Sequence, residues 1–248
     1  GYAAFKAGRG RLDNAGLVDG SHALRRSLEA VGVRFEVTGA DALDRQGGPF
    51  VFVANHVSAL ETQILPSILH DTAPCTFVVK SSLVNYPVFG KVLRAFNPII
   101  VERADARADL RVVLEQGSNR LADGISVIIF PQAHRTAMFD RKAFNSIGMR
   151  LAKAAGVPMV PIALDTGAWA QGRLVTDIGW IRPDWPVRFA IGSPIAVSAS
   201  GQAAHQEAVN FIESELVKWN MLPAGKTAEP PQGPVSVGID ARSATPGG

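Results

Sequence analysis

Residues 50–61, FVFVANHVSALE, combine an apolar run, a polar turn and the start of a helix. The five consecutive apolar residues from Phe50 to Ala54 are typical of a strand that is buried on both faces. A helix is predicted over residues 59–69, with Pro66 as a kink or stop. A strand that leads directly into a helix is the repeating unit of an α/β protein, and here it leaves His56 at the carboxyl end of the strand.

The same alternation of apolar runs and amphipathic segments continues along the chain. Strands are predicted over residues 35–38, 50–54, 76–79, 98–101, 126–130, 158–164 and 187–191. Helices are predicted over residues 21–31, 59–69, parts of 83–96, 109–121, 144–155 and 202–219. Ser21 is expected to cap the first helix and Gly156 to close the helix that ends at Ala155. The alternation predicts an α/β fold, a mostly parallel central sheet covered by helices on both faces.

The composition supports one sizeable domain. Hydrophobic residues make up 47% of the 248 residues and charged residues 19%, which is enough apolar material for a buried core. Residues 1–222 are therefore interpreted as a single domain, with a motif-bearing core at about 50–165. Residues 223–248 are rich in Pro, Gly, Ser and Ala, which predicts a flexible tail.

The sequence predicts neither a membrane-spanning helix nor a signal peptide. No run approaches the roughly 18 uninterrupted apolar residues of a spanning helix, and residues 1–11 lack the apolar core of a signal peptide. The chain does not begin with Met, which leaves open a membrane anchor upstream of Gly1.

Basic residues are concentrated in the middle of the chain. Residues 80–153 contain 12 Lys or Arg and 6 Asp or Glu, whereas the whole chain has a formal net charge of only +3. A local basic excess favours an anionic partner: nucleic acid, a phosphorylated small molecule or an acidic membrane surface. Taken alone, the basic excess is better explained by a solvated basic face.

His56 and Glu61 are the first candidates for chemistry. If His56 lies in the turn before the helix, Glu61 in the first helical turn can reach back to it. The carboxylate would then fix the imidazole tautomer and stabilise the imidazolium that forms when His56 accepts a proton. Residues 58–61 also match a capping box, S-x-x-E, which explains Glu61 without catalysis.

Four blocks of sequence resemble those of the glycerolipid acyltransferases, which include the 1-acylglycerol-3-phosphate and glycerol-3-phosphate acyltransferases. Their N-H-x-x-x-x-D block is similar to NHVSALE at residues 55–61, and a block ending in Arg is similar to IIVER at 99–103. Their F-P-E-G-T-R-S block corresponds to FPQAHRT at 130–136, and V-P-I-V-P-V to VPMVPI at 157–162. Each block is weak alone, but four in order and at the right spacing are specific.

The resemblance implies both a fold and an activity. The fold would be like that of glycerol-3-phosphate acyltransferases. The activity would be transfer of a fatty acyl group from acyl-CoA or acyl carrier protein to a lysophospholipid hydroxyl, most simply 1-acylglycerol-3-phosphate to give phosphatidate. His56 would be the general base, Glu61 its partner, and Arg103 and Arg135 a phosphate clamp. The other positions that the resemblance assigns to substrate binding are Asn55, Lys80, Pro131, Gln132 and Thr136.

The sequence departs from the family pattern at several positions. Glu61 replaces the usual Asp, and Gln132 replaces the Glu of the third block. Ala133 and His134 replace Gly and Thr, and an Ala is strained where a Gly needs a positive φ. These departures put the identity of the acceptor in doubt more than the type of reaction. Two other functions stay open: a lipid-binding protein that has lost catalysis, and a thioester hydrolase in which His56 activates water.

Cofactors, metals and nucleophiles are not predicted. The chain contains no H-E-x-x-H and no G-x-S-x-G, and its single cysteine, Cys75, lies in an apolar run directly before the strand predicted over residues 76–79. We therefore expect no metal, no cofactor beyond the acyl thioester co-substrate, and direct attack by the acceptor hydroxyl. No nucleic-acid partner is expected.

Membrane contact follows from the substrate, because the acyl chain of a lysophospholipid lies in the bilayer. We expect peripheral contact with an anionic membrane, on its cytoplasmic side. Residues 83–96 could form an apolar and basic docking face, although an ordinary core helix explains the pattern equally well. Of Trp169, Trp180 and Trp185, at least two are expected in the core.

Overall fold

The computed structural model describes residues 14–44, 47–69, 74–86, 89–132, 135–136, 138–170, 172, 179–198 and 200–222. A seven-stranded sheet runs through this part of the chain in the order β1-β7-β6-β2-β5-β3-β4. The strands are β1 (Phe35–Thr38), β2 (Val51–Ala54), β3 (Cys75–Lys80), β4 (Ile99–Val101), β5 (Ser126–Ile129), β6 (Met159–Asp165) and β7 (Val187–Ile191). Neighbours are parallel, except for the antiparallel pair β6 and β7. The predicted mostly parallel sheet is confirmed.

Burial along the strands follows their place in the sheet. Every residue of the central strands β2, β5 and β6 is buried, as expected for parallel strands covered on both faces. The outermost strand β1 instead alternates, with Phe35 and Val37 turned inward and Glu36 and Thr38 exposed. The apolar run before His56 therefore forms the middle of the molecule.

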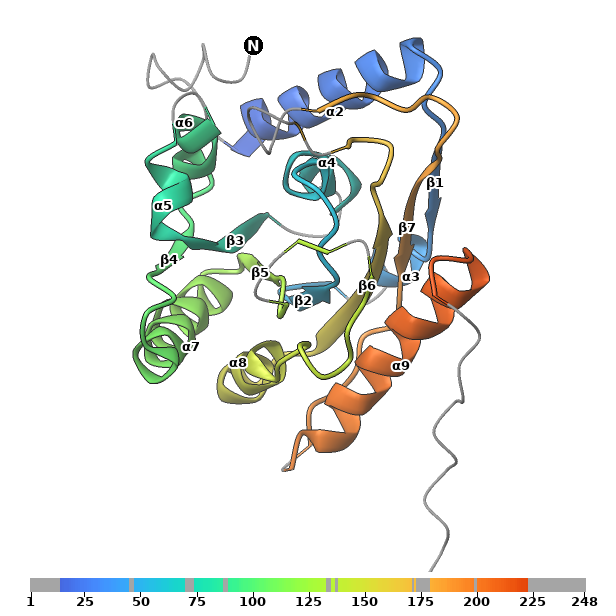
Figure 1. Ribbon diagram of the computed structural model, residues 1–248. Helices are drawn as coiled ribbons and strands as arrows, with labels where there is room; N and C mark the ends of the chain where they lie inside the picture. The colour runs from blue at the N-terminus through green and yellow to red at the C-terminus, as the bar shows by residue number, and fades with distance from the viewer. Residues whose placement is uncertain are drawn as a thin grey trace, which may run out of the picture.

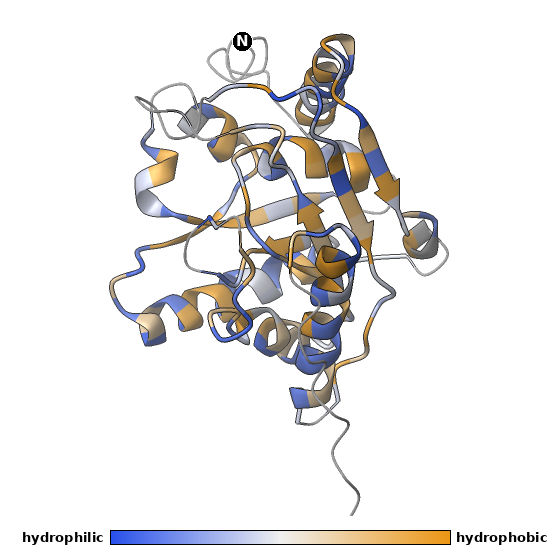
Figure 2. Cartoon of the chain, turned by 45° about the vertical axis from the view of Figure 1, so that its right-hand side comes forward, coloured by the Kyte–Doolittle hydropathy of each residue, from blue (hydrophilic) through white to orange (hydrophobic). Residues whose placement is uncertain are grey.

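Helices cover both faces of the sheet. They are α2 (Asn14–Ala30), α3 (Asp41–Asp44), α4 (Leu60–Leu69), α5 (Ser81–Val84), α6 (Phe89–Ala95), α7 (Ala106–Ala122), α8 (Ile147–Ala155) and α9 (Gln202–Lys218). Figure 1 shows α2 and α4 above the sheet and α7, α8 and α9 below it. Each layer has its own apolar core. In Figure 2 the central strands are largely hydrophobic, whereas the helices carry hydrophilic residues on their outer sides.

The start of α2 corrects one sequence prediction. Ser21 does not cap this helix, which begins at Asn14. Instead Ser21 is buried against α4: its hydroxyl donates to the carbonyl of Ile64 and accepts from the N–H of Ser67, each at 3.2 Å. The sequence alone cannot distinguish a serine that caps its own helix from one whose hydroxyl bonds to a helix far along the chain.

Other boundaries differ for local reasons. Helix α7 begins three residues before the prediction, because the Asp105 carboxylate caps it by accepting from the N–H groups of Arg107 and Ala108. Residues 83–96 are partly helical, as predicted: α5 ends at Val84, and α6 spans Phe89–Ala95. Gly156 adopts the left-handed conformation at the end of α8, as predicted. The tail predicted at 223–248 lies outside the described residues.

The chain leaves the neighbouring strands β2 and β5 on opposite sides of the sheet. After β2 it enters α4, which packs in the upper core, and after β5 it continues to α8, which packs in the lower core. At such a point the two loops diverge, and ligand sites of open α/β sheets form in the crevice between them. The loop after β2 contains His56, and the loop after β5 contains residues 130–136.

Candidate active site

The His56 ring is held in place by an aromatic contact. It stacks on Phe130, with the ring centroids 4.3 Å apart and the planes inclined by 17°. Phe130 in turn stacks on Phe77 of β3, at 6.5 Å between centroids. The His56 side chain is 15% exposed, so it is largely enclosed but still reaches the surface of the site.

Glu61 lies in the first turn of α4 and is fully buried. Its Oε1 accepts from the N–H groups of Val57, at 2.5 Å, and Ser58, at 2.8 Å. The Ser58 hydroxyl accepts from the N–H of Leu60 at 3.1 Å, which completes the interactions at the start of α4. The capping role predicted from S-x-x-E is therefore confirmed.

The same carboxylate also faces the imidazole. Glu61 Oε1 lies 3.6 Å from His56 Nδ1, which is an ion-pair distance but too long for a hydrogen bond. Nδ1 is buried and has no hydrogen-bond partner in the described ranges of the chain, so a small movement of the ring would complete the pair with Glu61. With Nδ1 turned toward Glu61, Nε2 is the nitrogen on the opposite side of the ring.

The environment keeps Glu61 ionised. Complete burial on its own raises the pKa of this carboxyl. The neighbouring His56 and the N–H groups of Ser58 and Val57 outweigh burial, so the pKa of Glu61 lies below its ordinary value of 4.5. At neutral pH the group is an anion, which can orient a neutral imidazole and stabilise a charged one.

Three basic side chains share a small cavity with His56. Lys80, Arg103 and Arg135 line this space of about 30 Å³ together with His56 and Phe130. They come from the end of β3, the residues after β4 and the loop after β5. The structure thus brings together His56 and the three cationic residues that the sequence predicted for the site.

Arg103 is placed by an unusual backbone conformation. Its φ of 58° is in the left-handed region, which is uncommon for a residue with a side chain. The Asp109 carboxylate holds this turn by accepting from the N–H groups of Glu102, at 3.0 Å, and Arg103, at 2.9 Å. Desolvation lowers the pKa of the Arg103 guanidinium and the charge of Asp109 opposes it, so Arg103 stays protonated at neutral pH.

A larger pocket of about 440 Å³ adjoins the His56 cavity. The two spaces share Val78, Arg103 and Phe130 as walls. Pro131 and Gln132 line the larger pocket rather than the smaller one. Gln132 is 2% exposed, and neither its Oε1 nor its Nε2 has a hydrogen-bond partner among the residues that the structure describes, which costs about 1–3 kcal/mol for each group.

Two of the predicted substrate-binding residues are engaged within the protein. Asn55 is buried, and its amide exchanges two hydrogen bonds with the backbone of Leu164, at 2.9 and 2.8 Å. Thr136 donates its N–H to the carbonyl of His56 at 2.9 Å and so ties the two loops of the site together. Their contact with substrate stays a prediction. Ala133 and His134 lie outside the described residues.

Sequence reasoning missed the roles of Phe130 and Asp109. Phe130 entered the sequence analysis only as part of a motif. Its position at the end of the strand predicted over residues 126–130 could have indicated an aromatic side chain beside His56. Asp109 has no comparable signal, because its role depends on how the chain folds back after β4.

The structure favours the core alternative for part of residues 83–96 and corrects the prediction for the tryptophans. Leu93 and Phe96 are buried in the core, so the core interpretation of residues 83–96 applies to them. Val88 and the Phe89 side chain lie outside what the structure describes. The expectation that at least two tryptophans pack in the core is wrong, because Trp180 is 80% exposed and Trp185 43% exposed. Trp169 does pack against the core.

Other reactive groups do not reach the site. Burial within β3 raises the pKa of the Cys75 thiol to about 12, which keeps it protonated and unreactive. Within the described ranges, no three His, Cys, Asp or Glu side chains are grouped as metal ligands would be. None of the helices described here is both long and apolar enough to cross a bilayer.

Comparison with known proteins places these observations in a family. Residues 34–165, more than half of the chain, match the acyltransferase family. The chain is 29% identical over 177 residues to a 1-acyl-sn-glycerol-3-phosphate acyltransferase of Pseudomonas aeruginosa, a match that covers 71% of this chain and 65% of that protein. It is 34% identical over 131 residues to a lyso-ornithine lipid O-acyltransferase of Rhizobium meliloti, which covers 53% of this chain and 42% of the relative.

A solved structure shows the same fold. The crystal structure of the 1-acyl-sn-glycerophosphate acyltransferase of Thermotoga maritima superposes with a TM-score of 0.63 at 19% sequence identity. The similarity covers 84% of this chain and 79% of that one. The chain spans less than two thirds of the length of the two relatives named above.

Proposed function

The chain belongs to the acyltransferase family, and on this premise we propose that it transfers a fatty acyl group from a thioester to a lysophospholipid hydroxyl. The proposed acceptor is 1-acylglycerol-3-phosphate, and the donor is acyl-CoA or acyl carrier protein. The observation that carries the proposal is the approach of His56 to the buried, ionised Glu61 within a cavity lined by three cations.

The reaction is a direct transfer with His56 as general base. Nε2 accepts the proton of the acceptor hydroxyl while its oxygen attacks the thioester carbonyl carbon. Glu61 stabilises the imidazolium that results, because its anion lies 3.6 Å from Nδ1. The tetrahedral intermediate collapses with cleavage of the C–S bond, and the imidazolium returns its proton to the leaving sulfur.

The cations supply recognition of an anionic acceptor. A guanidinium matches two phosphate oxygens at once, and Arg103, Arg135 and Lys80 meet around the cavity that contains His56. A phosphate held there would place the neighbouring glycerol hydroxyl close to Nε2. Positioning of two substrates adds to the effect of the base itself, which contributes roughly 10²–10⁴-fold.

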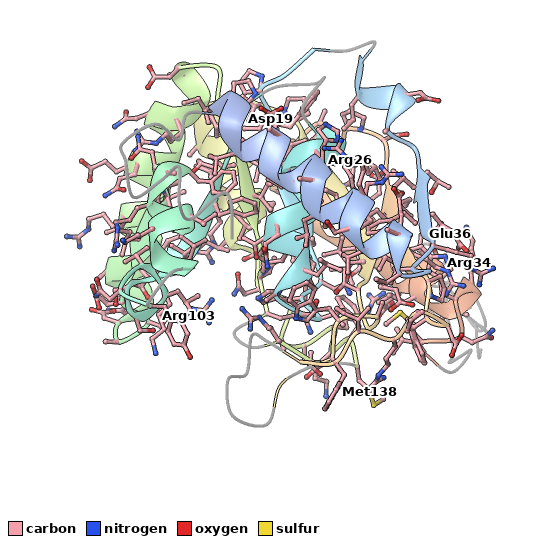
Figure 3. The ribbon with its side chains drawn as sticks, turned by 90° about the horizontal axis from the view of Figure 1, so that it is seen from above. Asp19, Arg26, Arg34, Glu36, Arg103 and Met138 are labelled. Atoms are coloured by element: carbon pink, nitrogen blue, oxygen red, sulfur yellow. The ribbon has the colours of Figure 1, made fainter. Side chains whose placement is uncertain are left out.

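Membrane contact belongs to the same proposal. The acceptor is a lipid, and we place the protein at the cytoplasmic surface of an anionic membrane, as a peripheral protein. Trp180 and Met138, which are 80% and 63% exposed, are apolar side chains that such a surface would accommodate. Figure 3, a view from above, shows Met138 and Arg103 along the same edge of the molecule.

A transfer assay tests the function. The protein is incubated with a radiolabelled acyl thioester and a panel of acceptors: 1-acylglycerol-3-phosphate, other lysophospholipids and lyso-ornithine lipid. The proposal predicts labelled diacyl lipid, with 1-acylglycerol-3-phosphate as the best acceptor. Labelled free fatty acid alone would identify a thioester hydrolase. Binding to liposomes without turnover of any thioester would identify a lipid-binding protein without catalysis.

A further inference from the structure

The pocket of about 440 Å³ is lined by residues of α7 and α8, and the proposed acceptor site does not account for it. Most of its wall is apolar, formed by Val101, Leu110, Val113, Ile129 and Ile147. The polar residues of its lining are Arg103, Asp109, Gln132, Asn145, Ser146 and Arg150. The Gln132 side chain is buried in the wall, whereas Arg103 and Arg150 are exposed.

Gln132 points to a ligand with a neutral polar group. A carboxamide offers both N–H donors and a carbonyl acceptor, and within the described part of the chain neither the Nε2 nor the Oε1 of Gln132 finds a partner. The group that complements it best is another amide, which can donate to Oε1 and accept from Nε2. A fatty acyl chain would leave both atoms unpaired, and a phosphate would leave the carbonyl oxygen without a donor.

The charges around the pocket indicate that this ligand also has an anionic end. Arg150 supplies positive charge at a part of the pocket that the His56 cavity does not share. Helix α8 also begins at the pocket with Ser146 and Ile147, although the Ile147 N–H already donates to Asn145 Oδ1 at 3.0 Å, so the arginine is the main source of positive charge. The Asp109 carboxylate also lines the pocket, but both its oxygens accept from backbone N–H groups. The pocket therefore fits a slender ligand with short apolar segments, an amide and a terminal phosphate.

We propose that this pocket binds the phosphopantetheine arm of the acyl donor, with Gln132 hydrogen-bonded to one of its amides. This inference rests on the proposed acyl transfer and deepens it. The arm is common to CoA and acyl carrier protein, and it has two amides, short hydrocarbon segments and a phosphate. Its sulfur end would lie near Val78, Arg103 and Phe130, the walls shared with the His56 cavity, so that the thioester reaches the proposed base, and its phosphate would lie toward Arg150.

The test compares donors that carry the same fatty acyl group, three with the pantetheine arm and one without it. Rates are measured for wild type and Gln132→Leu with acyl-CoA, acyl carrier protein, acyl-pantetheine and the S-ethyl thioester of the same fatty acid. The S-ethyl thioester has no amide. We expect Gln132→Leu to lower kcat/KM about 10-fold for the three donors that have the arm, and to leave the S-ethyl thioester and the acceptor KM unchanged. A loss confined to acyl-CoA or to acyl carrier protein would overturn the shared-arm proposal.

Matched variants control for folding. Gln206→Leu makes the same change on the exposed surface of α9, and we expect it to behave as wild type. Leu110→Trp fills the same pocket from α7 and should reproduce the donor-specific loss if Gln132→Leu fails to fold. An equal loss with all four donors, or a loss that appears only in the acceptor KM, would assign the pocket to another ligand.

A binding measurement separates this inference from the proposed function. The Kd of unacylated CoA is measured by calorimetry for wild type and Gln132→Leu, without any turnover. About 10-fold weaker binding by the variant supports the pocket assignment even if no acceptor is acylated. Unchanged CoA binding, together with normal acyl transfer by wild type, refutes the pocket assignment while the proposed function stands.

Discussion

The imidazole of His56 lies against the ring of Phe130, with 4.3 Å between their centroids. Phe130 also forms part of the wall between the small cavity around His56 and the larger pocket beside it. One side chain therefore contacts the proposed base and lies between the cavity proposed for the acceptor and the pocket proposed for the donor. This contact gives the first prediction.

Phe130→Leu removes the aromatic face while keeping an apolar side chain of moderate size. The His56 ring loses the contact that fixes its plane, so we expect kcat to fall roughly 10- to 100-fold while the substrate KM values change little. Steady-state kinetics measure the effect, and circular dichroism checks that the fold is retained. An unchanged kcat would show that the stacking has no role in positioning His56.

Glu61→Gln keeps the size of the side chain and removes its charge. The pKa of Glu61 is lowered in the folded protein, so its contribution to stability is fully present above pH 4.5 and is lost as the pH falls through the lower folded value. We expect wild type to be more stable than the variant at neutral pH, by about 1.5–3 kcal/mol, and this difference to shrink in acid. Thermal unfolding between pH 3 and 7 measures it. A difference that does not depend on pH would contradict an ionised Glu61.

Arg135→Ala removes one of the proposed phosphate contacts. A hydrogen bond to a charged group contributes about 1.5–3 kcal/mol, so we expect the KM for 1-acylglycerol-3-phosphate to rise about 10- to 100-fold while kcat changes much less. Arg26→Ala is the control, because Arg26 is exposed on α2, far from Arg103 in the view of Figure 3. Equal KM values for the two variants would exclude Arg135 from acceptor binding.

Cys75→Ala tests whether the transfer is direct. The thiol is buried in β3 and its pKa is raised to about 12, so it cannot act as a nucleophile at neutral pH. We expect kcat/KM to stay at the wild-type value, with a small loss of thermal stability. Loss of transfer in a folded Cys75→Ala variant would instead indicate an acyl-enzyme intermediate on this cysteine.

The fold could be predicted from the sequence where burial is uniform. The apolar runs in β2, β5 and β6 are strands covered on both faces, and Gly156 ends its helix as its type suggests. Prediction failed where a side chain takes its partner from far along the chain. Ser21 resembles a helix cap but bonds to Ile64, and Trp185 resembles a core residue but lies partly exposed with its Nε1 bonded to Asp165.

The site was predictable to the extent that its motifs are local. His56 and Glu61 are five residues apart, so a turn before a helix was enough to bring them together. The grouping of Arg103 and Arg135 followed from the resemblance and depends on strand order, which spacing alone does not provide. The buried position of Gln132 and the backbone turn held by Asp109 depend on three-dimensional packing, which leaves no signal in the sequence.

The central claim is that the His56 imidazole removes the proton of the acceptor hydroxyl, and His56→Ala tests it most directly. Single-turnover transfer of a labelled acyl group from its thioester to 1-acylglycerol-3-phosphate is measured for wild type and for variant protein shown to be folded. The account predicts that the rate falls at least roughly 10²–10⁴-fold while both substrates still bind. A folded His56→Ala protein that forms diacyl lipid at the wild-type rate would contradict it.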